Sequence, residues 1–267
     1  MRWRNLRVPL LPALLALVLA AGCGGESEQS AVESTVRRAV TAYNEANVDA
    51  FLALHTDQAI ESEYGLPRDL AAPRIAEIIG QPPIEVRSLG NTAVNGNNAT
   101  VDFERTQGKV LVLERVSLIK SEGNWKLDGF EDRPLDIPPT ATTVVIEMSE
   151  FAFAVDSRGI RDGNIALAIG NGGLQDHEAV VARIDKDTKL DELVPAIAQS
   201  AEGETPAGVE EIVAFGAYEP GETANVVFAE PLEPGRYAVF CFFPDVNDPE
   251  HTLHALKGMF AEFTIPG

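Results

Sequence analysis

Residues 237–263 read YAVFCFFPDVNDPEHTLHALKGMFAEF, with strand-like runs at both ends of the stretch. It contains four soft or borderline metal ligands: Cys241, His251, His254 and Met259. Thiolate, imidazole and thioether are soft or borderline ligands, which suit copper better than calcium or magnesium. Two histidines and a cysteine with a weak axial methionine form the site that blue-copper electron transfer requires. The sequence therefore predicts a copper site, and His177 in the segment LQDHEAVV is the candidate for the histidine from elsewhere.

Short strand-like runs continue through residues 141–267, separated by turns rich in glycine and proline. The predicted strands are Thr143–Met148, Phe151–Val155, Ile165–Ile169, Ala179–Ile184, Ile212–Ala217, Thr223–Ala229, Gly235–Phe242 and Gly258–Ile265. Apolar residues recur at helical spacing over Lys189–Ser200, which predicts a helix inserted between strands. This pattern indicates a β-sandwich.

Several phrases of this segment resemble the cupredoxin family, which comprises plastocyanin-like and pseudoazurin-like type 1 copper proteins. A proline-glycine turn at Leu232–Tyr237 leads into the cysteine strand, and His177 follows a loop rich in asparagine and glycine. Four residues separate His254 from Met259, which ends a Gly-Met pair as in pseudoazurin-like members.

The resemblance implies a Greek-key sandwich over residues 141–267 that binds one copper ion. It assigns His177 as the first histidine ligand, Cys241 as the thiolate, His254 as the second histidine and Met259 as the axial ligand. The implied function is one-electron transfer or copper handling, without substrate chemistry. The alternative is a cupredoxin fold without metal, in which Cys241 would be a buried core thiol and the protein an interaction or structural lipoprotein.

Two features depart from the family pattern. Twelve residues separate Cys241 from His254, so the loop must bulge outward, and His251 within it is a rival for the second histidine. Glu178 stands where many cupredoxins have an asparagine whose amide braces the cysteine loop, and a carboxylate cannot donate in that way. We therefore expect a more open site than in the family, an altered colour, or copper binding without efficient electron transfer.

The chain begins with three arginines and an apolar run, which predicts a signal peptide over residues 1–22. The sequence LAAGC before and at Cys23 resembles a bacterial lipobox, which implies lipidation of Cys23 and a tether over residues 23–30. We expect an exported protein, anchored by lipid to the bacterial cell membrane on its extracytoplasmic side. Lipidation would leave Cys241 without a disulfide partner, and a bound metal would explain that thiol.

Residues 31–135 contain helical patterns followed by strand-like runs. Helices are predicted within Ala31–Leu54, with a break at 44–47, and at Leu70–Ile79; strands are predicted at Ile84–Thr92, Asn98–Thr106, Lys109–Ser121 and from Asn124 onward. Helices before a curved antiparallel sheet that ends in GNWKL resemble the NTF2-like (SnoaL-like) fold, an α+β cone. A proline-rich linker is predicted at 136–140.

The resemblance to the NTF2-like fold does not define an activity, because that fold carries enzymes, ligand carriers and dimerisation modules. The polar cluster in the right region consists of His55, Asp57, Glu61, Glu63 and Tyr64. We favour a binding or packing module over an enzyme built on His55, Asp57 and Tyr64. The segment Leu54–Asp57 also fits a simple helix exit.

The net charge limits the partners of this 267-residue chain. The formal charge is −20, and removal of residues 1–22, which hold three arginines and no acidic residue, would bring it to about −23. Such a charge repels nucleic-acid phosphates and argues against nucleic-acid binding. The remaining expected partners are the membrane, through the lipid anchor, and a redox protein.

Overall fold

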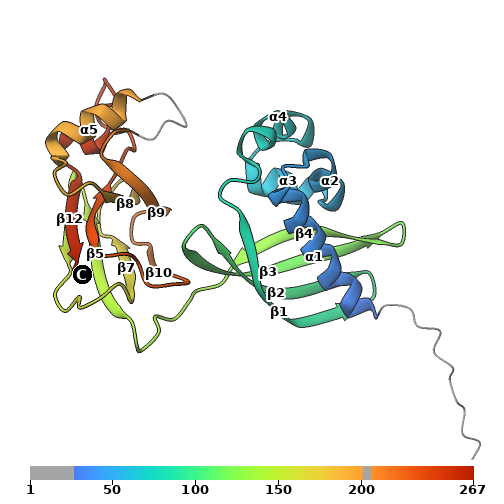
Figure 1. The fold of residues 1–267 in the computed structure, drawn as a ribbon. Coiled ribbons are helices and arrows are strands. Elements are labelled where there is room, and N and C mark those ends of the chain that lie inside the picture. Colours follow the sequence, from blue (N-terminus) through green and yellow to red (C-terminus); the bar gives the residue numbers. More distant parts are fainter. Residues whose placement is uncertain (1–26, 201–205) are drawn as a thin grey trace, which may run out of the picture.

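The computed structural model describes residues 27–200 and 206–267, which form a helix-and-sheet unit followed by an all-β unit (Figure 1). The predicted signal peptide and the first half of the predicted tether, with Cys23, lie outside these residues. Helix α1 begins at Glu28, within the predicted tether, because the Ser27 hydroxyl accepts a hydrogen bond of 3.1 Å from the backbone of Ser30 and caps the helix. Within the described ranges, no helix combines the length and apolar character that crossing a membrane requires.

The first unit consists of four helices and a four-stranded antiparallel sheet. The helices are α1 (Glu28–Asn44), α2 (Val48–Leu54), α3 (Asp57–Tyr64) and α4 (Arg68–Ile78); the strands, in the order β1-β2-β3-β4, are β1 (Ile84–Asn95), β2 (Asn98–Gln107), β3 (Val110–Ser121) and β4 (Asn124–Asp132). Helix α1 lies along the sheet, and its buried residues Val36 and Val40 share a core with Val101 and Phe103 of β2. The α+β fold class predicted for this unit is confirmed.

Helix α3 was not predicted, and its boundaries have local causes. The hydroxyl of Thr56 accepts a hydrogen bond from the backbone of Ala59 at 3.1 Å, which caps the start of the helix. Gly65 ends the helix in the left-handed region, with φ of 66°. Leu54 ends α2 and His55 is its C-cap, so the helix exit expected at Leu54–Asp57 is found, and it leads directly into α3.

The second unit is a sandwich of two four-stranded sheets. One sheet has the order β10-β7-β5-β6, formed by β5 (Thr142–Ser149), β6 (Ala152–Asp156), β7 (Ile165–Asn171) and β10 (Thr223–Val227); the other has the order β12-β11-β8-β9, formed by β8 (His177–Ile184), β9 (Val209–Tyr218), β11 (Gly235–Phe240) and β12 (Phe260–Ile265). Between them lies a core that includes Ile146, Leu167, Val181 and Val239, all fully buried. The predicted β-sandwich is confirmed.

The inserted helix is α5 (Leu190–Gln199), and it covers the outer face of the second sheet. Leu193 and Val194 of α5 share a cluster with Ala182, Ala238 and Phe240, whose side chains alternate with those that face the sandwich core. Strands β8 and β11 are therefore buried on both faces, which explains their nearly continuous apolar sequence. A rigid, buried strand pair results, and the metal-ligand candidates lie at one of its ends.

Candidate metal centre

Strands β8 and β11 bring His177 and Cys241 together. The two strands pair antiparallel, with Val180 opposite Phe240, so that the start of β8 and the end of β11 lie at the same edge. His177 is the first residue of β8, and Cys241 directly follows β11. The third candidate, His254, begins the short 3₁₀ helix η1 (His254–Lys257), which leads into β12.

The three side chains point their ligand atoms at one another. The Nδ1 atoms of His177 and His254 are 3.1 Å apart, and Sγ of Cys241 lies 3.8 Å from the first and 3.3 Å from the second. Donors bound to one ion at about 2.0–2.3 Å, as in zinc sites, would stand roughly 3.3–3.8 Å apart. The separations in this protein are therefore those of a ligand set that converges on a single point.

Burial and hydrogen bonding also fit a bound cation. All three residues have 0 % of their surface exposed. The Nε2 atoms of both histidines are buried without a hydrogen-bond partner in the described part of the chain. A cation between the two Nδ1 atoms and Sγ would satisfy those three atoms, and the Nε2 atoms would then carry the ring hydrogens. Because the donors are soft or borderline, copper fits this set.

Met259 is placed beside this cluster by its backbone. Its carbonyl oxygen accepts a hydrogen bond from the Cys241 amide at 3.3 Å, and its own amide donates to the His254 carbonyl at 3.0 Å. The residue is fully buried and belongs to the same apolar cluster as Cys241. Together the four residues form the set typical of a type 1 copper site.

The surroundings disfavour charge on all three side chains when no cation is present. Burial raises the pKa of the Cys241 thiol to about 11, although the Glu178 amide, which donates to Sγ at 3.4 Å, acts in the opposite direction. Burial also lowers the pKa of His177 and of His254. Neutral imidazoles keep the lone pairs that a metal ion needs, and a bound cation would deprotonate the thiol outright.

The long loop between Cys241 and His254 is ordered by hydrogen bonds across its base. A β-bridge joins Pro244 to Leu253, and the His254 amide donates to the Phe243 carbonyl at 2.8 Å. The bulge is therefore closed before it reaches the ligands, as the spacing requires. His251 lies in the exposed part with φ of 50°, so the structure brings His254, not His251, to the site.

Glu178 braces the cysteine loop in a way that the sequence did not suggest. Its carboxylate accepts a hydrogen bond of 2.6 Å from the backbone amide of Phe242. It thus ties the start of β8 to the residue after Cys241 by accepting, where an asparagine amide would donate. The expectation of a more open site was wrong, since the Glu178 side chain and all three ligand candidates are buried.

Further bracing residues were missed because they are distant in sequence. Gln175 donates to Asp245 at 3.1 Å and accepts from the Val246 amide at 2.9 Å, and Lys257 forms ion pairs with Asp245 at 2.6 Å and with Asp248 at 2.7 Å. These contacts hold the long loop between Cys241 and His254 against the loop that precedes His177 and against η1. The only sequence signal for them is their place within a few residues of the ligands.

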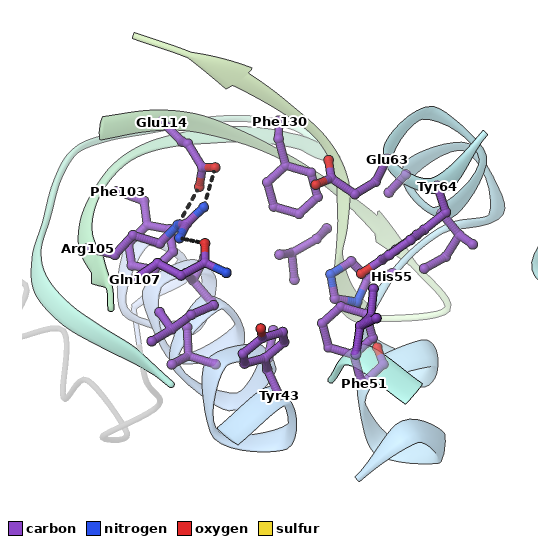
Figure 2. A pocket seen from close by; sticks show the side chains of 18 residues that line it. Tyr43, Phe51, His55, Glu63, Tyr64, Phe103, Arg105, Gln107, Glu114 and Phe130 are labelled. Carbon is purple, nitrogen blue, oxygen red and sulfur yellow. Dashed lines mark hydrogen bonds and ion pairs between the residues drawn. The ribbon is translucent and has the colours of Figure 1, made fainter. Parts of the chain in front are cut away.

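The polar cluster predicted in the first unit is divided by the structure. His55, Glu63 and Tyr64 line a cavity enclosed by the helices and the sheet (Figure 2). Asp57 and Glu61 lie outside it, and Asp57 forms an exposed ion pair of 2.5 Å with Arg68. The triad of His55, Asp57 and Tyr64 considered for an enzyme is therefore not assembled.

Comparisons with known proteins found likenesses in structure alone. Neither a family model nor a curated protein matches the sequence. A dithionite-reduced auracyanin from the photosynthetic bacterium Roseiflexus castenholzii is 25% identical, with 48% of this chain and 98% of that chain covered and a TM-score of 0.31. Auracyanin B is 20% identical, with 50% and 94% covered and a TM-score of 0.30.

A second group of similar structures consists of NTF2-like proteins. An NTF2-like protein of unknown function from Shewanella baltica OS155 is 14% identical, with 39% of this chain and 93% of that chain covered and a TM-score of 0.30. Cupredoxins and NTF2-like proteins, the two kinds named from the sequence, thus both occur among the structures to which this chain is similar.

Proposed function

We propose that this protein binds one copper ion through His177, Cys241 and His254, with Met259 as the axial ligand, and serves in one-electron transfer or copper handling. The observation that carries the proposal is the convergence of three buried donor atoms, His177 Nδ1, His254 Nδ1 and Cys241 Sγ, within 4.8 Å of one another. When bound, copper would supply a one-electron redox couple.

The residues around the site would limit rearrangement between two redox states. His177 and Cys241 sit at the ends of paired strands that are buried on both faces. Glu178 fixes the backbone after Cys241, and the edge of the Phe151 ring packs against His254 with ring centroids 5.3 Å apart. Rigid, dry surroundings of this kind tune a metal centre and keep water away from it.

A docking area for a redox partner is proposed on the same end of the sandwich. Three apolar side chains are exposed there: Leu174 in the loop before His177, Val246 in the long loop and Leu256 in η1. Exposed apolar groups close to a site are typical of interaction surfaces. The charge of −20 on the whole chain favours a cationic partner that is steered by electrostatics.

The proposal includes export and a lipid anchor at Cys23, supported by the signal-peptide pattern and the lipobox-like sequence. Such an anchor would hold the copper unit at the extracytoplasmic face of a bacterial membrane. Labelling of producing cells with palmitate tests it. Cys23→Ala is expected to abolish the label and to release the protein from the membrane fraction. A labelled Cys23→Ala protein would contradict the anchor site.

Titration of the full-length chain with Cu(II), followed by visible absorption and metal analysis, tests the copper site. We expect one equivalent of copper and an intense thiolate-to-copper band. Cys241→Ala should remove this band, whereas Cys23→Ser, which removes the only other thiol of the chain, should retain it. Absence of the band in the unaltered protein, with no change in Cys241→Ala, would leave a metal-free binding module as the better description.

A further inference from the structure

The cavity of the first unit is partly open to solvent and has room for a small molecule (Figure 2). It lies between α1, α2 and α3 and the face of the sheet that carries Phe103 and Phe130. Its volume is about 230 Å³, comparable to the space that about eight water molecules occupy in the liquid. A molecule with one six-membered ring and a short side chain fits such a space.

Most of the wall is apolar and aromatic. The rings that line it belong to Tyr43, Phe51, Tyr64, Phe103 and Phe130. Aromatic faces carry partial negative charge, so they attract cations as well as apolar groups. The walls therefore suit an apolar body and tolerate a positive charge at one end of it.

His55 contributes a hydrogen-bond acceptor to the cavity. Its Nδ1 lies 2.7 Å from the Phe51 carbonyl oxygen, which can only accept, so Nδ1 carries the hydrogen. Nε2 then has a lone pair, and no described residue donates to it. Burial lowers the pKa of His55 to about 4, which keeps the ring neutral at physiological pH. The residue is 3 % exposed, but its Nε2 atom is not completely buried, so a donor in the cavity, from water or from a ligand, can reach this nitrogen.

The opposite end of the cavity holds an ion pair that is already satisfied. Arg105 donates to both carboxylate oxygens of Glu114, at 2.8 and 3.1 Å, and to the Gln107 side chain at 2.6 Å (Figure 2). Both charged side chains are largely buried, at 13 % and 11 % exposed. An anionic ligand would have to compete with Glu114 for this arginine, which makes the pair a poor anion site.

Glu63 supplies a second carboxylate that has no cation of its own. Its carboxylate points from the end of α3 into the cavity (Figure 2), and it forms no ion pair with any described residue. Glu63 as a whole is exposed at the edge of the cavity, but partial burial of its carboxylate, and then the charge of Glu114, raise the pKa of Glu63, while Arg105 acts in the opposite direction. A positive charge placed near Glu63 would relieve the repulsion between the two carboxylates.

We propose that this cavity binds a small organic cation, a primary amine on an aromatic or branched apolar body. The ammonium group would lie between the Glu63 carboxylate and Nε2 of His55, and both accept the hydrogen bonds that an ammonium donates. The body would fill the space lined by Phe51, Phe103 and Phe130. This binding site is separate from the metal centre and does not depend on it.

Three probes that share a phenyl ring and two further carbon atoms test the charge preference. These are 2-phenylethylamine, 2-phenylethanol and phenylacetate, titrated at pH 7 into the full-length chain and followed by calorimetry and by the ¹⁵N resonances of the His55 ring. We expect the amine to bind at least about tenfold more tightly than the alcohol, because charged hydrogen bonds are the stronger ones. Phenylacetate should bind weakest.

Matched variants on one helix locate the charge that matters. Glu63→Gln should lower the affinity for the amine about tenfold and leave that for the alcohol unchanged. Glu61→Gln, on the same helix but outside the cavity, should change neither. Cys241→Ala should also bind the amine normally, which separates this test from that of the copper site.

Several results would overturn the proposal. Tighter binding of phenylacetate than of the amine would show an anion site. Equal losses in Glu63→Gln and Glu61→Gln would indicate attraction to the acidic surface as a whole. Failure of all three probes to perturb the His55 resonances at concentrations of about 10 mM, a limit that corresponds to less than 3 kcal/mol of binding, would show that the cavity does not take this class of ligand.

Discussion

The protein buries histidines in both of its units and uses a different ring nitrogen in each. In the sandwich, the Nδ1 atoms of His177 and His254 face each other at 3.1 Å, and both Nε2 atoms lack a partner in the described part of the chain. In the first unit, Nδ1 of His55 donates to the Phe51 carbonyl, and Nε2 is the nitrogen that remains free to accept a hydrogen bond. The backbone that meets each ring therefore decides what the ring can do.

One residue type thus serves two purposes in this protein. Strand pairing in the sandwich brings soft or borderline donors to a single point, where a metal ion would satisfy all of them. In the first unit, the Phe51 carbonyl of α2 accepts from Nδ1 of His55. Aromatic side chains separate the other polar groups around the cavity. Converging donor atoms suit a single ion, whereas a lined cavity suits a small molecule.

The largest expected effect separates the two histidines of the long loop. His254→Ala removes a ligand candidate and should lower the affinity for Cu(II) by more than about 100-fold, since loss of an outer partner alone costs 10- to 100-fold. His251→Ala should leave the affinity unchanged, because that side chain is exposed and away from the site. Competition with a copper chelator measures both. Similar losses in the two variants would contradict the assignment of His254.

The second effect concerns the stability of the first unit as a function of pH. Burial lowers the pKa of His55 to about 4, below the value of about 6.5 in the unfolded chain. The unfolded state thus binds the extra proton first, so the stabilisation by neutral His55 is full above pH 6.5 and is lost as the pH falls toward 4. The loss should reach about 3 kcal/mol of unfolding free energy.

His55→Gln, which keeps a donor for the Phe51 carbonyl, serves as the comparison. We expect the difference in unfolding free energy between the unaltered protein and this variant to shrink by about 3 kcal/mol between pH 7 and pH 4. Denaturant unfolding followed by the fluorescence of the buried Trp125 measures it in the cone. A constant difference over this range, or a pKa above 6 for His55 by NMR, would show that the ring is not held neutral by burial.

A smaller effect is expected at Glu178. Glu178→Ala leaves the Phe242 amide without its acceptor at the end of β11, which should destabilise the sandwich by about 1–3 kcal/mol. Glu178→Gln retains a carbonyl oxygen and should restore most of this loss. Thermal unfolding of the sandwich measures both variants. Equal destabilisation by Ala and Gln would assign the role to the charge and not to the hydrogen bond.

The smallest effect is expected at Lys257, which joins η1 to the long loop. Lys257→Met keeps an apolar chain of similar length but removes the ion pairs with Asp245 and Asp248. Loss of this partly exposed network should loosen the long loop and speed hydrogen exchange of the Val246 amide by about fivefold at most. Lys189→Met, which removes an exposed pair with Glu192 on α5, is the control and should leave this amide unchanged.

Three of the four ligand candidates could be predicted from the sequence because they lie in a short stretch with one cysteine and a Gly-Met pair, and His177 was added by the resemblance of its loop. The sandwich could be predicted since its strands are short and bounded by glycine and proline. Helix α3 could not, because its start depends on a single hydroxyl, that of Thr56, in a segment without a long apolar period. The role of Glu178 was also hidden, since its partner is a backbone amide 64 residues away.

The bridge between Pro244 and Leu253 separates the metal centre from the length of the loop outside it. Doubling the length of a flexible loop whose ends are already fixed adds only about 0.6 kcal/mol of closure entropy. The exposed turn at Pro249 and Glu250 is thus a place where the chain can be elaborated without rebuilding the ligand geometry. The turn is therefore an insertion site, where a peptide that recognises a chosen redox partner could be grafted next to the candidate metal centre.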